Sequence, residues 1–140
     1  MKAEGKAAAV LEWAKGWPDL GGYLKLNAIT NVEGDAALNV VNNDAYVQRY
    51  IDGTAVRRYT VQLRIIAAWS DGYDPVNVEA EALAASWQDW VSEQYSLGNV
   101  PAIGNVTSIE PMWNVPALNY VNQDEGLAEY IVQAVIEYEE

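Results

Sequence analysis

The sequence of 140 residues contains no histidine, no cysteine and no phenylalanine, and its 8 basic residues stand against 20 acidic ones. Without histidine or cysteine the chain cannot build a Ser-His-Asp or Cys-His nucleophile, a thiol redox pair, a disulfide or a structural zinc site. At a formal charge of −12 it lacks the basic footprint of proteins whose main task is nucleic-acid binding. Long apolar runs are also missing, so we expect neither a membrane-spanning helix nor a secretory signal.

What the chain does contain indicates a folded protein. Apolar residues make up 51% of it, and its aromatic residues are six Trp and nine Tyr. This composition excludes intrinsic disorder, which goes with low hydrophobicity and few aromatics. The length predicts a single domain over residues 1–140.

Hydrophobic periodicity predicts two helices with strands between and after them. The first helix covers 2–15, and the second runs from about Pro75 or Asn77 to Gln94, with Asp74 or Asn77 as its N-cap. Trp87 and Trp90 lie on the apolar stripe of the second helix and are most simply core residues. Strands are expected at 23–29, 38–41, 45–51, 54–69, 106–110 and 127–138. This order predicts an α+β fold, a mostly antiparallel sheet of four to six strands with both helices packed on one face.

The pair Asp52-Gly53 separates two strand-like runs and is typical of a hairpin with a type I′ turn. In the strand that follows, apolar residues alternate onto one face beginning at Tyr59, and Arg58 and Arg64 fall on the opposite face. One face is therefore expected in the core, and the other meets water or a partner.

Positive charge is confined to the first half of the chain. Residues 1–64 hold 8 basic and 7 acidic side chains, whereas residues 65–140 hold 13 acidic and none basic. One interpretation is drift toward an acidic, soluble surface. The other is that a basic hairpin face, kept off the core, docks on an acidic surface of a neighbouring copy, a head-to-tail contact that closes into a ring. The candidate subunit-interface residues are Arg49, Arg57, Arg58 and Arg64.

No motif predicts catalysis, a metal site or a cofactor. The acidic stretch 71–74 with Asn77 lacks the ligand spacing of a calcium loop, and a turn with a helix cap is the better interpretation. A pair of catalytic carboxylates needs an environment that separates their pKa values, which a sequence cannot display.

Several short motifs nevertheless occur in an informative order over about residues 1–139. They are Tyr50-Ile51-Asp52-Gly53, Arg57-Arg58-Tyr59, the stretch Asp71 to Asn77, Trp90-Val91-Ser92-Glu93-Gln94, Gly98-Asn99-Val100-Pro101, and Gln123, Gly126, Ala128, Tyr130 and Tyr138. With its segments in this order, the chain resembles the phage tail terminators of the small minor capsid protein family of long-tailed phages. Family members tend to carry Phe where this long strand has Val or Leu, and the region 16–37 matches poorly.

The resemblance implies a function that composition and periodicity do not. Tail terminators are small α+β proteins that form a hexameric ring on the head-proximal end of the tail tube, stop its growth and contact the head-completion proteins. The resemblance thus implies a virion structural protein assembled in the bacterial host cytoplasm. Its partners would be further copies of itself, the tail tube protein and head-completion proteins, with DNA passing the lumen unbound. It implies no enzyme activity, cofactor or membrane. The alternative is a head–tail connector or adaptor that binds partners without forming its own ring.

Overall fold

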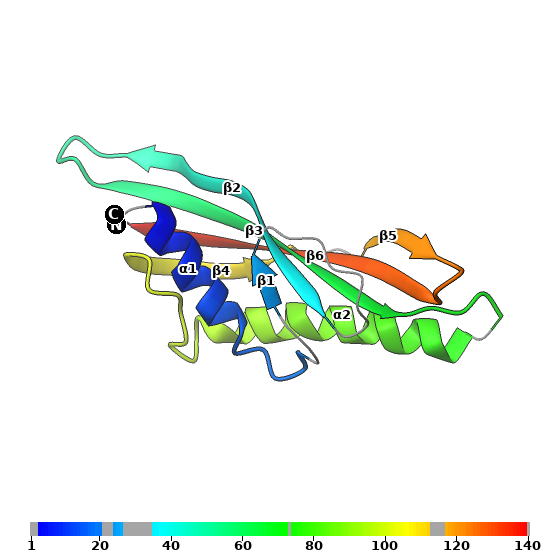
Figure 1. The fold of residues 1–140 in the computed structure, drawn as a ribbon. Helices are drawn as coiled ribbons and strands as arrows, with labels where there is room; N and C mark the ends of the chain where they lie inside the picture. The colour runs from blue at the N-terminus through cyan, green and yellow to red at the C-terminus, as the bar shows by residue number, and fades with distance from the viewer. Residues whose placement is uncertain (1–2, 21–23, 27–34, 73, 113–116, 140) are drawn as a thin grey trace.

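The computed structural model describes residues 3–20, 24–26, 35–72, 74–112 and 117–139. Its elements in chain order are α1 (Ala3–Ala14), β1 (Leu24–Leu26), β2 (Ala36–Arg49), β3 (Ala55–Ala68), α2 (Asp74–Gln94), β4 (Asn105–Pro111), β5 (Ala117–Asn122) and β6 (Leu127–Glu139). The predicted α+β class is confirmed: the strands form one sheet, and two helices lie beneath it (Figure 1).

The sheet is built around β3 and β6, which pair antiparallel along their whole length, from Val56 opposite Glu139 to Ala68 opposite Leu127. β2 pairs with the other edge of β3, and β1 adds to β2 in parallel over three residues. β4 and β5 share the remaining edge of β6, with β4 on its C-terminal half and β5 on its N-terminal half. Only β1 departs from the antiparallel arrangement within the described strands.

The hydrophobic core lies between one face of this sheet and the two helices. On β3 the residues Tyr59, Val61 and Leu63 are buried opposite the buried Ile136, Ala134 and Val132 of β6. The indole of Trp87 on α2 is fully buried against them, and Trp90 is half-buried. The rings of Trp90 and Trp13 lie 5.0 Å apart, so α2 and α1 also contact each other.

Two strands differ from the sequence prediction. The runs predicted at 38–41 and 45–51 are one strand, β2, which crosses the polar stretch 42–44 without ending. Hydrogen bonding to β3 holds it together, at the cost of register shifts near Asn42 and between Tyr46 and Gln48. β5 was not predicted at all; its pairing with β6 supplies a stability that its own Asn-containing sequence does not indicate.

The burial of Trp87 leads to a test of the core. We expect Trp87→Ala to lower the free energy of unfolding by about 3–5 kcal/mol, since it removes a fully enclosed indole and leaves a cavity. Leu97→Ala, at a side chain that is 70% exposed, should change it by no more than about 0.5 kcal/mol. Urea unfolding measures both; equal effects would contradict the packing described above.

Candidate interaction surface on the β2–β3 hairpin

The hairpin between β2 and β3 ends in a loop of three residues. Tyr50 N donates to Thr54 O at 2.9 Å and Gly53 N donates to Tyr50 O at 3.2 Å, which encloses Ile51, Asp52 and Gly53. Gly53 has φ of 93°, the left-handed conformation that ends a three-residue hairpin loop. The predicted hairpin is therefore present, but its loop is one residue longer than that of a type I′ turn.

Asp52, within the loop, fixes the loop's conformation by bonding to Thr54, just before the next strand. Its Oδ1 accepts hydrogen bonds from the Thr54 backbone N–H at 3.0 Å and from the Thr54 hydroxyl at 2.7 Å. Both bonds favour the ionised carboxylate and hold the pKa of Asp52 below its ordinary value. The tip is thus a defined structure that presents Ile51 to solvent.

The four arginines predicted to share one hairpin face lie on two faces. Arg58 is opposite Glu137 on the outer face of the sheet, and Arg64 follows on the same side. Arg57, by contrast, pairs with the buried Tyr138, so it lies on the face that carries the helices. Arg49 lies opposite Ala55 and shares that face. The prediction of a single basic face is wrong because neighbouring strand positions point to opposite sides.

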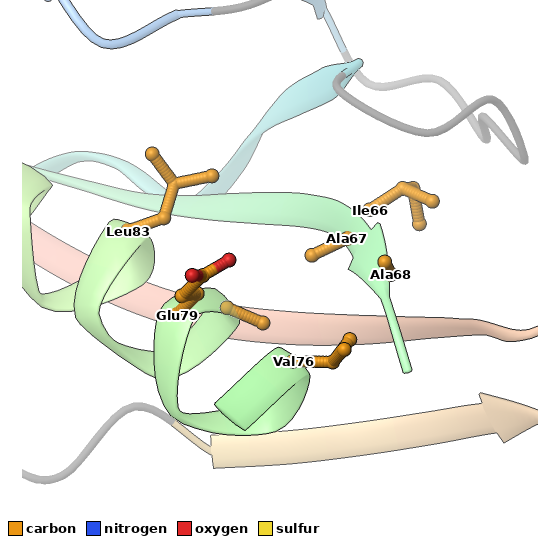
Figure 2. Close-up of a pocket in the computed structure, with 7 residues that line it drawn as sticks. Ile66, Ala67, Ala68, Val76, Glu79 and Leu83 are labelled. Atoms are coloured by element: carbon orange, nitrogen blue, oxygen red, sulfur yellow. The ribbon is translucent and has the colours of Figure 1, made fainter. Parts of the chain in front are cut away.

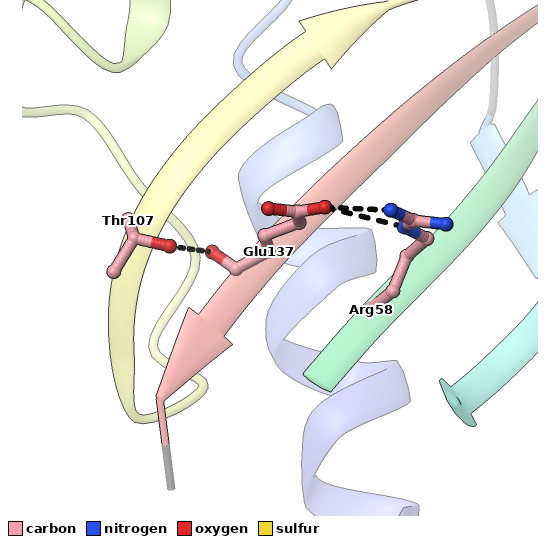
Figure 3. A network of polar contacts seen from close by, with 3 residues as sticks. All are labelled: Arg58, Thr107 and Glu137. Carbon is pink, nitrogen blue, oxygen red and sulfur yellow. Dashed lines mark hydrogen bonds and ion pairs between the residues drawn. The ribbon is translucent and has the colours of Figure 1, made fainter. Parts of the chain in front are cut away.

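The two outer-face arginines pair with acids of their own chain. Arg58 Nη2 lies 2.8 Å from Glu137 Oε1, and the Glu137 backbone oxygen accepts a 3.2 Å hydrogen bond from the Thr107 hydroxyl (Figure 3). Arg64 Nη2 lies 2.7 Å from Glu129 Oε2 and also contacts Oε1. Acidic partners from the second half of the sequence were expected for these residues, and here they belong to the same molecule.

The two helix-side arginines gather instead on one aromatic ring. The guanidinium carbons of Arg49 and Arg57 lie 3.6 Å and 4.3 Å from the ring centroid of Tyr46, which is directly opposite Arg57 in the ladder. These are cation–π distances. Sequence reasoning missed Tyr46, because its position beside Arg57 depends on the register across the hairpin.

We refer to residues 46–57 as the arm. Figure 1 shows its tip extending past the C-terminal end of β6. A surface hollow of about 470 Å³ lies on it, lined by Tyr46, Arg49, Tyr50, Gly53, Thr54, Ala55 and Arg57. Apolar side chains of the arm are also open to solvent, with Val47 46% and Ile51 108% exposed. The arm thus combines two cations with exposed apolar surface.

Other hollows also hold acidic side chains. One, at β5 and the start of β6, is lined by Glu125 and by Glu129, which is paired with Arg64. Figure 2 shows another, between the end of β3 and the start of α2; its volume is about 180 Å³, and its lining is aliphatic except for Glu79. A single carboxylate does not make an acid–base pair. Within the described ranges no group of three or more acidic side chains is arranged to hold a metal ion.

The predicted turn before α2 is present in altered form. Asn77 does not cap the helix: its amide nitrogen donates to Ser70 O at 2.7 Å, and its Oδ1 accepts from Ser70 N at 3.0 Å. This bridge ties the loop after β3 to the first turn of α2. The side chain of Asp74 lies outside the described residues.

Fold and surface together define a small α+β protein whose most distinctive external feature is a cationic, partly apolar arm. No protein-family model matches the chain, and a search of curated proteins finds no match. In the part of the chain that the structure covers, no helix has both the length and the apolar character needed to cross a membrane.

The conformation of Gly53 can be tested at the loop. Gly53→Ala should lower the free energy of unfolding by about 1–2 kcal/mol, because an L side chain is strained at that φ. The matched control is Gly72→Ala, where an added Cβ also meets nothing within 4 Å but φ is not positive. A control as destabilising as Gly53→Ala would contradict this explanation.

The two outer-face ion pairs should differ in energy. In the Arg64–Glu129 pair the side chains are 24% and 8% exposed, and in Arg58–Glu137 they are 44% and 30% exposed. Glu129→Ala leaves a poorly solvated cation and should destabilise by about 3 kcal/mol, whereas Glu137→Ala should cost about 1 kcal/mol or less. Urea unfolding of both variants at the same salt concentration makes the comparison, and the reverse order would contradict it.

Proposed function

We propose that this protein is a virion structural protein, a tail terminator whose copies form a ring on the head-proximal end of a phage tail tube. The observation that carries the proposal is the arm, which presents Arg49 and Arg57 at one end of a molecule with a formal charge of −12. A cationic patch and an acidic surface in different places on one chain fit a head-to-tail contact between identical copies.

Two further points support it. The architecture, a mostly antiparallel sheet with both helices on one face, is the one that the resemblance to tail terminators implies. A strongly acidic ring would also let DNA pass without adhering, since like charges repel. The proposed partners are other copies of the chain, the tail tube protein and head-completion proteins, and the resemblance implies six copies in the ring. The protein acts in this proposal by binding, with no catalysis and no cofactor.

The proposal is tested by adding the purified protein to polymerising tail tube protein. Tubes should stop growing, and electron micrographs should show a ring at one tube end. Because charge complementarity contributes to the contact between copies, ring formation should weaken as salt rises. Native mass spectrometry at several protein concentrations gives the number of copies.

A matched addition of an unrelated acidic protein of similar size serves as the control and should leave tube length unlimited. Tubes that keep growing, with none of the protein at their ends, would overturn the proposal. Binding at the tube end as single copies, without a ring, would favour a head–tail adaptor instead.

A further inference from the structure

The arm offers both positive charge and exposed apolar side chains to a partner. Two guanidinium groups share the ring of Tyr46, so positive charge is concentrated beside the hollow. Ile51 is fully exposed at the tip, and Val47 is half-exposed. A surface that complements both features presents carboxylates at one end and an apolar depression at the other.

The outer face of α2 has this combination. Val78, Glu81, Ala82 and Ala85 line a shallow hollow of about 340 Å³ near the start of the helix. Further along the same face come the exposed residues Asp89 and Glu93. Residues 78, 82, 85, 89 and 93 follow the three- and four-residue spacing of one helical face, so these features form a continuous strip.

The spacings of the two surfaces agree. Ile51 is five residues from Tyr46, at most about 17 Å at 3.3–3.4 Å per strand residue, since β2 ends at Arg49 and Ile51 lies in the loop. Asp89 and Glu93 are seven and eleven residues from Ala82, in the α2 hollow, about 10 Å and 16 Å at 1.5 Å per helical residue. An arm lying along the helix can therefore place Ile51 at Val78, Ala82 and Ala85 of the hollow while the two guanidinium groups lie near Asp89 and Glu93.

Within one molecule the tip of the arm does not reach the hollow at the start of α2. Figure 1 shows the tip of the arm at one end of the sheet and the start of α2 at the opposite end. The contact thus joins two copies, and each copy offers one arm and one strip. Every copy then uses both surfaces when the chain of contacts closes.

Strand addition at the edge of β2 is the less favourable alternative. β1 pairs with Ala36 to Leu38 of β2, and no described strand pairs with the Tyr46 to Arg49 stretch on that edge. However, β2 has register shifts between Val40 and Asn42, between Asn42 and Ala45, and between Tyr46 and Gln48. Such irregularities disrupt the regular hydrogen-bonding edge that another strand would need. Side chains of the arm are the better docking elements.

We propose that the arm of each copy docks along the outer face of α2 of the next copy. Ile51 enters the hollow between Val78 and Ala85, and Arg49 and Arg57 pair with Asp89 and Glu93. This inference rests on the proposed ring and names the two surfaces that build it.

Charge reversal tests the pairing. Two double variants are compared: Arg49→Glu with Arg57→Glu, and Asp89→Arg with Glu93→Arg. Each should raise the protein concentration needed for ring formation at least about tenfold, as measured by native mass spectrometry. All four changes in one chain restore opposite charges and should restore the ring. The helix variant should stay folded by circular dichroism, because cations are favourable near a helix C-terminus.

Two controls carry the same kinds of charge change elsewhere. Arg58→Glu reverses the charge of the residue next to Arg57 on the opposite face of the sheet. Asp124→Arg with Glu125→Arg repeats the helix substitution at exposed positions between β5 and β6. Both should leave ring formation unchanged; controls that disrupt it as strongly as the test variants would show that net charge alone is responsible and overturn the pairing.

A cross-link tests the geometry directly. The natural chain has no cysteine, so Ile51→Cys and Ala82→Cys in one chain introduce the only thiols. Oxidation of rings, in solution or on tube ends, should give a ladder of covalent oligomers up to the full ring, whereas either single variant gives dimers at most.

The outcomes separate this inference from the proposed function. Rings that form normally but yield no ladder overturn the docking of arm on helix and leave the tail-terminator proposal standing. A wild-type protein that neither forms rings nor stops tubes overturns the proposed function, and the docking with it. A third outcome concerns DNA. If the wild-type ring binds DNA fragments, and Arg49→Glu with Arg57→Glu abolishes that binding but leaves the ring mass unchanged, the hollow on the arm would be a phosphate site and the docking would be overturned.

Discussion

The antiparallel ladder between β3 and β6 is the interaction on which the rest of this structure depends. It joins the two halves of the sequence over the whole length of both strands. Its alternation decides which side chains enter the core beneath the sheet and which remain on the outer face. It also provides the edges on which β2, β4 and β5 are added. Because β3 begins immediately after the hairpin loop, the same ladder fixes the position of the arm.

This ladder accounts for part of the uneven charge distribution along the chain. Arg58 lies directly opposite Glu137, and Arg64 is a diagonal neighbour of Glu129, so basic residues of the first half meet acidic residues of the second half inside one molecule. Cross-strand pairs of opposite charge are favourable at these separations. A charge split along the sequence is therefore not by itself a sign of assembly. In the proposed ring, the contact between copies uses the arginines of the arm and the carboxylates on the outer face of α2.

Local patterns predicted the elements whose stability is local. The helices at 2–15 and 75–94 appear within a few residues of α1 and α2, because their apolar stripes and flanking breakers are contiguous in the sequence. The sequence patterns divided β2 into two strands and missed β5. Both strands contain polar residues that are tolerated because the strand pairs with another one. Arg57 is two residues before the buried Tyr59, and residues two apart on a strand lie on the same face, so the sequence already indicated that Arg57 lies on the helix side. The stacking of Arg49 and Arg57 on Tyr46 could not be predicted without the cross-strand register and the three-residue loop.

The arm is built in a way that suits docking. Among the described strands only β2 and β3 continue beyond the pair Val56–Glu139, and a two-stranded ribbon is marginally stable in water without further support. Asp52 and the closing hydrogen bonds define its tip, and the ring of Tyr46 holds both guanidinium groups close together. Such restraint lowers the conformational entropy that a partner must offset on binding. The register shifts of β2 meanwhile hinder strand addition at its edge, so the proposed docking uses side chains, which carry the specificity that a backbone edge lacks.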